Sequence, residues 1–252
     1  METTKQSYSD TFTIAWRCLL LSCRNPETFL TSILLPALMM LLFVSLFGSL
    51  IRVDGTSYTA YIVPGVLIQC AAQGSSTTAI MVNQDITSGI LSRFSTLPIR
   101  QGALLYGHVL EACARNLVTS AVVLVIALLL GFRPALTLTG LGITFLLLSG
   151  MILALSWLAV AVGILSKSAQ GASSLSSLAI VLPYLSSGFV PTEHLPPLLR
   201  TFARYQPMTP VIDAMRDALS GSPADAGTLG AALLTAVFCA ASVLFLKRRL
   251  LG

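Results

Sequence analysis

The residues best suited to acid–base chemistry are His108, Glu111 and Arg115, which lie within eight positions of one another. On a helix, Glu111 and Arg115 are one turn apart with the acid on the N-terminal side, the favourable order for an ion pair. His108, a turn earlier, could extend this pair into a proton relay. We favour the simpler interpretation: near the end of an apolar segment, long side chains reach water and pair there.

Two further polar sets lie inside long uncharged segments. Gln69 and Gln73 are spaced i and i+4 in the middle of residues 55–84, and Gly74 follows them. Buried amides need hydrogen-bond partners, and small residues let helices approach closely, so we favour a packing seam over direct substrate contact. The second set comes near the end of residues 168–192 and consists of Tyr184, Ser186 and Ser187.

Motifs for several kinds of chemistry are missing from the sequence. There is no G-x-x-x-x-G-K-[ST] phosphate loop, no G-x-S-x-G and no H-E-x-x-H. The five cysteines form no C-x-x-C pair, and no basic cluster is interleaved with aromatic residues. We therefore expect no catalytic residues, no metal site, no bound cofactor and no nucleic-acid partner for this chain.

The spacing of the charges predicts the fold class. Six intervals contain no Asp, Glu, Lys or Arg: 28–51, 55–84, 116–132, 134–166, 168–192 and 226–246. About 20 apolar helical residues cross a hydrocarbon core of about 30 Å. With 55% hydrophobic and only 10% charged residues, the chain cannot cover a soluble globule with polar surface. We predict an all-α integral membrane protein with six transmembrane helices, forming one domain over residues 1–252.

The expected spans follow from these intervals and from local stop signals. Pro183 is expected to bend the fifth span. The six predicted spans are Thr31–Ile51, Tyr58–Val82, Leu104–Phe132, Leu138–Leu165, Ala169–Val190 and Thr228–Leu246.

The orientation follows from the lysines and arginines. If the N-terminus is inside, ten of them lie on the inner side and five on the outer side. The positive-inside rule then places both termini in the cytoplasm.

Three amphipathic segments lie outside the spans. Residues 8–26, ended by Pro26, predict a helix in the cytoplasmic interface. Residues 85–97, ended by Pro98, predict a short cytoplasmic helix, which needs the bilayer or another protein for stability. Residues 191–221 predict two short external helices that re-enter the membrane boundary, the second capped by Thr209 and ended by Gly221.

The whole chain resembles the permease subunits of type-2 ABC (ATP-binding cassette) exporters, and among them the daunorubicin-resistance-like drug exporters. The resemblance rests on the N-terminal interfacial helix and on four segments in order. These are YIVPGVL at 61–67, D-x-x-x-G-x-L-x-R-F-x-x-L-P-I-R at 85–100, GFVPTEHLP at 188–196 and QPMTPVIDAMRDALSG at 206–221.

The resemblance implies a bacterial plasma-membrane subunit that pairs with a second permease copy or homologue. It also implies two ATPase subunits on the cytoplasmic face, which bind the ATP and magnesium. The 85–97 segment resembles the coupling helix that docks on the ATPase. Its docking residues would be Asp85, Gly89, Ile90, Leu91, Arg93, Phe94, Leu97 and Pro98.

The function implied is ATP-driven export of a hydrophobic or amphiphilic compound, such as a drug, an antibiotic or a lipid. In this family the second and fifth spans flank the route, so Gln69, Gln73, Tyr184, Ser186 and Ser187 are the candidate pathway residues. Two alternatives stay open: export of a lipid-linked polysaccharide, and a membrane sensor or immunity protein that does not transport.

Overall fold

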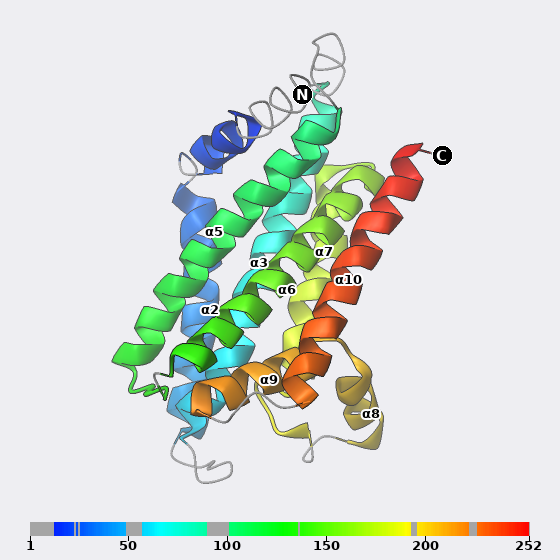
Figure 1. Ribbon diagram of the computed structural model, residues 1–252. Helices are drawn as coiled ribbons and strands as arrows, with labels where there is room; N and C mark the ends of the chain where they lie inside the picture. The colour runs from blue at the N-terminus through cyan, green and yellow to red at the C-terminus, as the bar shows by residue number, and fades with distance from the viewer. Residues whose placement is uncertain are drawn as a thin grey trace.

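The computed structural model describes residues 13–22, 24, 26–48, 57–89, 101–135, 137–192, 196–221 and 226–251. Within these residues the regular elements are all helices, arranged as an elongated bundle (Figure 1). A short helix, Thr13–Ser22, precedes the bundle. The others are α2 (Pro26–Phe47), α3 (Tyr58–Thr87), α5 (Gln101–Leu129), α6 (Leu138–Leu165), α7 (Ala169–Val181), the 3₁₀ helix η1 (Leu182–Leu185), α8 (Pro197–Tyr205), α9 (Met208–Ser220) and α10 (Ala226–Leu251).

Helix α3 lies at the centre of the bundle. It packs against α2, α5, α6, α7 and α9, and most of its side chains are buried. Small residues allow this close packing: a Cβ added to Gly65 would lie 2.5 Å from the carbonyl oxygen of Gly188. The backbone after η1 therefore lies directly against α3.

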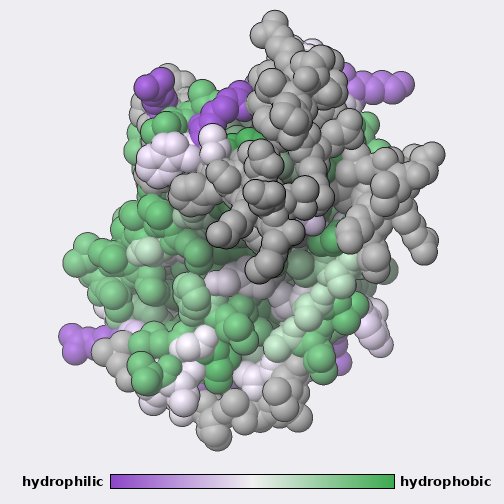
Figure 2. All heavy atoms as spheres, turned by 45° about the horizontal axis from the view of Figure 1, so that its top comes forward, coloured by the Kyte–Doolittle hydropathy of each residue, from purple (hydrophilic) through white to green (hydrophobic). Residues whose placement is uncertain are grey.

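The surface is that of a protein surrounded by lipid. On the face shown in Figure 2, hydrophobic side chains cover most of the described surface, and the few strongly hydrophilic ones lie towards its margins. Among the described residues, three helices contain segments long and apolar enough to cross a membrane: α2 at Leu30–Phe47, α5 at Ala103–Leu129, and α6 over Leu138–Leu165. The prediction of an all-helical integral membrane protein is confirmed.

The fifth predicted span differs from the sequence-based expectation. We expected a helix over Ala169–Val190, but the α-helix ends at Val181 after 13 residues and continues as η1. Proline lacks a backbone N–H and its ring crowds the preceding turn, which weakens an α-helix at Pro183 and favours its end there. The bend expected at Pro183 is thus a change of helix type.

The two ends of the bundle carry different elements. The Thr13–Ser22 helix and the last turns of α10 lie at one end, and α8 and α9 lie at the other (Figure 1). A helix lies at Thr13–Ser22, within the segment 8–26 predicted to lie in the interface, but Pro26 begins α2 and does not end that helix. Proline suits a first helical position, where its missing N–H costs nothing.

Two short helices, α8 and α9, lie within residues 191–221, and their re-entry from the outer side stays a prediction. The cap expected from Thr209 is wrong, because α9 begins earlier, at Met208. The Thr209 hydroxyl instead donates to the Ala203 carbonyl at 2.6 Å and joins α8 to α9. Gly221 ends α9 with φ +87°, a left-handed conformation that glycine adopts without strain.

Candidate functional site

The predicted coupling segment begins inside α3. Asp85 and Ile86 belong to the last turn of this helix, which ends at Thr87, and Gly89 follows with φ +74°. Gly89 therefore ends a helix, and the expected start of a separate helix at Asp85 is wrong. The remaining predicted docking residues lie outside the described part of the chain: Ile90, Leu91, Arg93, Phe94, Leu97 and Pro98.

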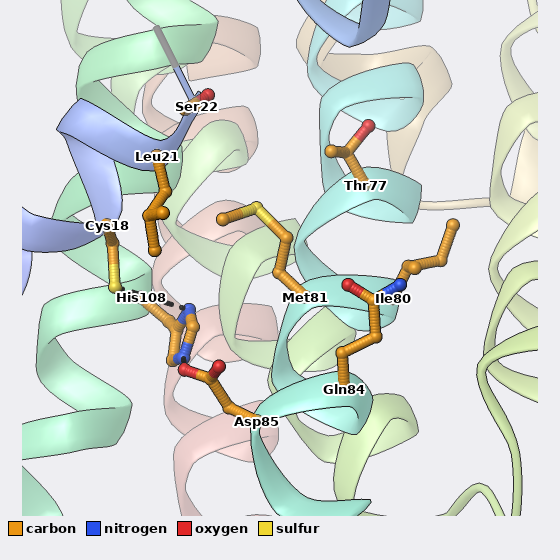
Figure 3. A pocket seen from close by; sticks show the side chains of 9 residues that line it. All are labelled: Cys18, Leu21, Ser22, Thr77, Ile80, Met81, Gln84, Asp85 and His108. Atoms are coloured by element: carbon orange, nitrogen blue, oxygen red, sulfur yellow. Dashed lines mark hydrogen bonds and ion pairs between the residues drawn. The ribbon is translucent and has the colours of Figure 1, made fainter. Parts of the chain in front are cut away.

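Asp85 is held by residues from two other helices. Its Oδ2 atom lies 3.1 Å from Nε2 of His108 on α5 and 3.6 Å from a guanidinium nitrogen of Arg17 on the Thr13–Ser22 helix. The other ring nitrogen of His108 lies 3.9 Å from the sulfur of Cys18. In Figure 3 the His108 ring lies between Cys18 and Asp85. This cluster joins three segments at the start of the coupling segment.

A cavity of about 360 Å³ lies beside this cluster. Cys18, Asp85 and His108 line it together with apolar residues such as Leu21 and Met81 (Figure 3). The predicted coupling segment therefore begins, at Asp85, beside a partly hollow junction.

The pair Glu111 and Arg115 is formed, but not near water. Arg115 Nε donates to Glu111 Oε1 at 2.7 Å, and both residues are buried, with exposures of 4% and 1%. Arg115 also donates to the Gly74 carbonyl and, at 2.8 Å, to the Thr78 hydroxyl on α3. The interpretation that these side chains reach water is wrong, because their hydrogen-bonding groups are satisfied inside the α3–α5 contact.

His108, which a proton relay would need beside this pair, is hydrogen-bonded to Asp85 instead. Its hydrogen bond is with the end of α3 and not with Glu111. The three residues singled out at the start therefore form two separate contacts, each joining α5 to α3.

The glutamine segment of α3 lies in the same contact. A Cβ added to Gly74 would lie 1.6 Å from Oδ1 of Asn116 on α5, so Gly74 is a packing position. Gln69 is fully buried, and neither atom of its amide has a hydrogen-bond partner among the described residues. Gln73 is partly exposed. Gly74 therefore lies in the packing seam between α3 and α5. The side-chain amides of Gln69 and Gln73 can still form further hydrogen bonds.

The candidate residues after α7 are largely occupied by structural contacts. Ser186 is buried and its oxygen accepts from the Gly188 N–H at 3.0 Å. Ser187 donates to Asp213 Oδ1 at 2.7 Å. The Tyr184 ring stacks on Phe189 with centroids 4.7 Å apart. These contacts hold the segment after α7 in place. Among the described residues, no hydrogen bond joins any of the three to Gln69 or Gln73.

The match to known families decides what kind of protein this is. Residues 9–220 match the family model described as ABC-2 type transporter, which covers most of the chain and all the sites above. The chain belongs to the ABC-2 type transporter family.

Similar proteins indicate which members of this family the chain resembles. The permease is 29% identical over 215 residues to the daunorubicin resistance ABC transporter permease protein DrrB1 of Streptomyces coeruleorubidus, covering 85% of this chain and 76% of that one. It is also 29% identical over 235 residues to the probable doxorubicin resistance ABC transporter permease protein DrrC of Mycobacterium tuberculosis, covering 86% and 79%. The protein is thus a bacterial membrane protein and a transport subunit of an ABC exporter, with drug-resistance permeases as relatives.

Two contacts of the permease escaped the sequence analysis. Asp85 and His108 are 23 positions apart, so no local pattern links them. Arg216 on α9 donates to the Ser187 carbonyl at 2.7 Å and to Asp213 Oδ1, and its guanidinium lies 3.9 Å from the centroid of the Tyr61 ring. The i,i+3 spacing of Asp213 and Arg216 could have indicated their pairing, but nothing pointed to Tyr61.

Proposed function

We propose that this permease is the membrane-spanning subunit of an ATP-driven exporter, which moves a hydrophobic or amphiphilic compound out across the cytoplasmic membrane. The observation that carries the proposal is the similarity to drug-resistance permeases over about 85% of the chain. A drug, an antibiotic or a lipid fits this class. The chain has no phosphate-binding loop, so ATP and magnesium are assigned to a partner subunit.

The proposed topology has six crossings with both termini in the cytoplasm. It is supported by the ten-to-five distribution of Lys and Arg. The Thr13–Ser22 helix and the end of α10 lie at the same end of the bundle, as an even number of crossings requires (Figure 1). In this orientation α8 and α9 are external.

Docking of two ATPase subunits is assigned to the segment 85–97. Its apolar stripe of Ile90, Leu91, Phe94 and Leu97 provides the side chains that a groove in the ATPase would bury. The junction of Asp85, His108 and Arg17 supports this role, because it ties the start of the segment, at the end of α3, to α5 and to the Thr13–Ser22 helix. A push on the segment is thereby passed to α3 and α5 together.

Pairing with a second permease is supported by the outer face of α7. Gln170 and Ser174 are exposed there, next to the exposed apolar residues Leu175 and Leu178. Small polar residues on the surface of a membrane helix allow close contact with another helix. A second permease copy facing α7 would cover this face.

The substrate route is placed along α3 and α7. On the cytoplasmic half of α3, one face of partly or fully exposed residues comprises Gln73, Thr77, Ile80, Met81 and Gln84. This face offers hydrogen-bonding groups beside apolar surface, as an amphiphilic substrate requires. Gln73 is its deepest polar group, and the buried Gln69 lies one turn beyond it on α3. Tyr184, Ser186 and Ser187 are assigned to the support of the route at its outer end.

The test is to look for an ATP-binding-cassette gene beside that of the permease and to co-express the two proteins. We expect the two to purify together, and vesicles containing both to move an amphiphilic drug only when ATP is supplied. A permease that retains the drug without any ATPase would favour a sensor or immunity protein. Transport of a lipid-linked polysaccharide but not of drugs would favour the other alternative.

A further inference from the structure

A second cavity, of about 330 Å³, lies among α3, α5, α6 and α9. It is near the end of the bundle where α9 lies, and apolar side chains form nearly all of its lining. Leu67 of α3 and Leu219 of α9 contribute to its wall, and Phe145 of α6, 61% exposed, lines it towards the surface. The volume is at the lower end for ligand sites, about 300–1,000 Å³.

Two hydroxyl groups interrupt the apolar lining. Ser120 of α5 and Thr144 of α6 both line the cavity and are more than nine-tenths buried. Neither hydroxyl has a hydrogen-bond partner among the described residues. Neighbouring hydroxyls on the same helices behave differently: Thr119 donates to the Asn116 carbonyl, and Ser156 donates to the Ile152 carbonyl. A ligand for this cavity therefore needs an apolar body and an acceptor group.

The depth of the hydroxyls identifies the ligand class. Thr144 is six residues from the start of α6, which is about 9 Å along a helix axis. The polar region of a bilayer is about 5–8 Å thick on each side of the hydrocarbon core. If α6 begins at the outer edge of that region, Thr144 lies at the depth of phospholipid ester groups. Ser120, nine residues or about 14 Å before the end of α5 at Leu129, lies somewhat deeper. An ester carbonyl accepts hydrogen bonds, and the chain attached to it is apolar.

We propose that this cavity binds one ester-linked acyl chain of a membrane phospholipid, with Ser120 and Thr144 donating hydrogen bonds to its ester carbonyl. The proposed topology makes this an outer-leaflet lipid. The two hydroxyls lie on α5 and α6, and α3 contributes Leu67 from its outer half. The proposed route follows the cytoplasmic half of α3 and α7, so this site is distinct from it.

The test places the photoreactive residue p-benzoylphenylalanine at Phe145 in the full-length chain. The protein is reconstituted in vesicles of phosphatidylethanolamine and phosphatidylglycerol, illuminated, and weighed intact by mass spectrometry. We expect adducts of one phospholipid mass. In the variant that combines Ser120→Ala and Thr144→Val, the adduct fraction should fall roughly three- to tenfold, because two hydrogen bonds are lost. In vesicles of diether lipids, which lack ester carbonyls, the adduct fraction should fall equally for the protein that keeps Ser120 and Thr144.

Matched controls separate a site from general contact with lipid. The same photoreactive residue at Val125 of α5, exposed but not part of the cavity, should give adducts that none of these changes alters. Thr119→Val and Ser156→Ala remove satisfied hydroxyls and should leave the Phe145 adducts unchanged. Equal adducts from ester and ether lipids would overturn the proposal. So would a crosslink between two permease chains, which would assign the cavity to the contact between copies.

Discussion

The Nε2 atom of His108 lies 3.1 Å from Oδ2 of Asp85, joining the beginning of α5 to the last turn of α3. Arg17 reaches the same carboxylate at 3.6 Å from the Thr13–Ser22 helix. Asp85 is the first residue of the segment assigned to ATPase docking. One carboxylate thus ties the last turn of α3 to α5 and to the Thr13–Ser22 helix.

The first prediction concerns this contact. Asp85→Ala and His108→Ala should each lower the free energy of unfolding by about 1–3 kcal/mol, because a partly buried hydrogen bond involving a charged group is lost. The double variant should cost clearly less than the sum, since both changes remove one interaction. Thermal unfolding of the purified permease measures this. Lys167→Ala, at an exposed site, is the control, and strict additivity would show that the two side chains do not interact.

A second prediction concerns the buried ion pair. Arg115→Met leaves Glu111 buried without its partner and should destabilise the permease by about 3–5 kcal/mol. Adding Glu111→Gln should recover part of the loss, because no unpaired charge remains. Yield of folded protein and its thermal midpoint are the measurements. If Arg115→Met is as stable as the parent, the pair must be accessible to water.

The third prediction tests the packing seam. Gly74→Ala places a methyl group on the Asn116 side chain and should cost about 1–3 kcal/mol. The second change Asn116→Ala should relieve the collision and restore most of the stability. Gly142→Ala on α6 is the matched control, because nothing lies within 4 Å of the added carbon there. A tolerated Gly74→Ala with a changed substrate range would instead make Gly74 a pathway residue.

The fourth prediction concerns orientation. In a cysteine-free background, a membrane-impermeant thiol reagent applied to intact cells should label Pro223→Cys and spare Gln101→Cys. Permeabilised cells should show labelling at both positions, which checks that each cysteine is reactive. The reverse pattern in intact cells would invert the topology.

The helical fold could be predicted because charge spacing and apolar length depend on short stretches of sequence. The end of α7 could not, since Pro183 allowed either a bend or a change of helix type. The depth of Glu111 and Arg115 was missed because their partners, Gly74 and Thr78, lie on another helix. In the same way, the contact of Asp85 with His108 depends on how α3 and α5 pack, and the sequence around each residue does not show this.

The central claim is that the segment 85–97 couples an ATPase to this permease, and Leu97→Asp tests it most directly. The permease is co-purified with its ATP-binding-cassette subunit, and ATP-dependent drug uptake into inside-out vesicles is measured. Loss of one buried apolar anchor typically costs about 2 kcal/mol or more of binding, so Leu97→Asp should reduce co-purification strongly and abolish uptake, while membrane levels stay normal. Pro223→Asp, in the predicted external loop, should change neither. Normal co-purification and normal uptake with Leu97→Asp would contradict the account.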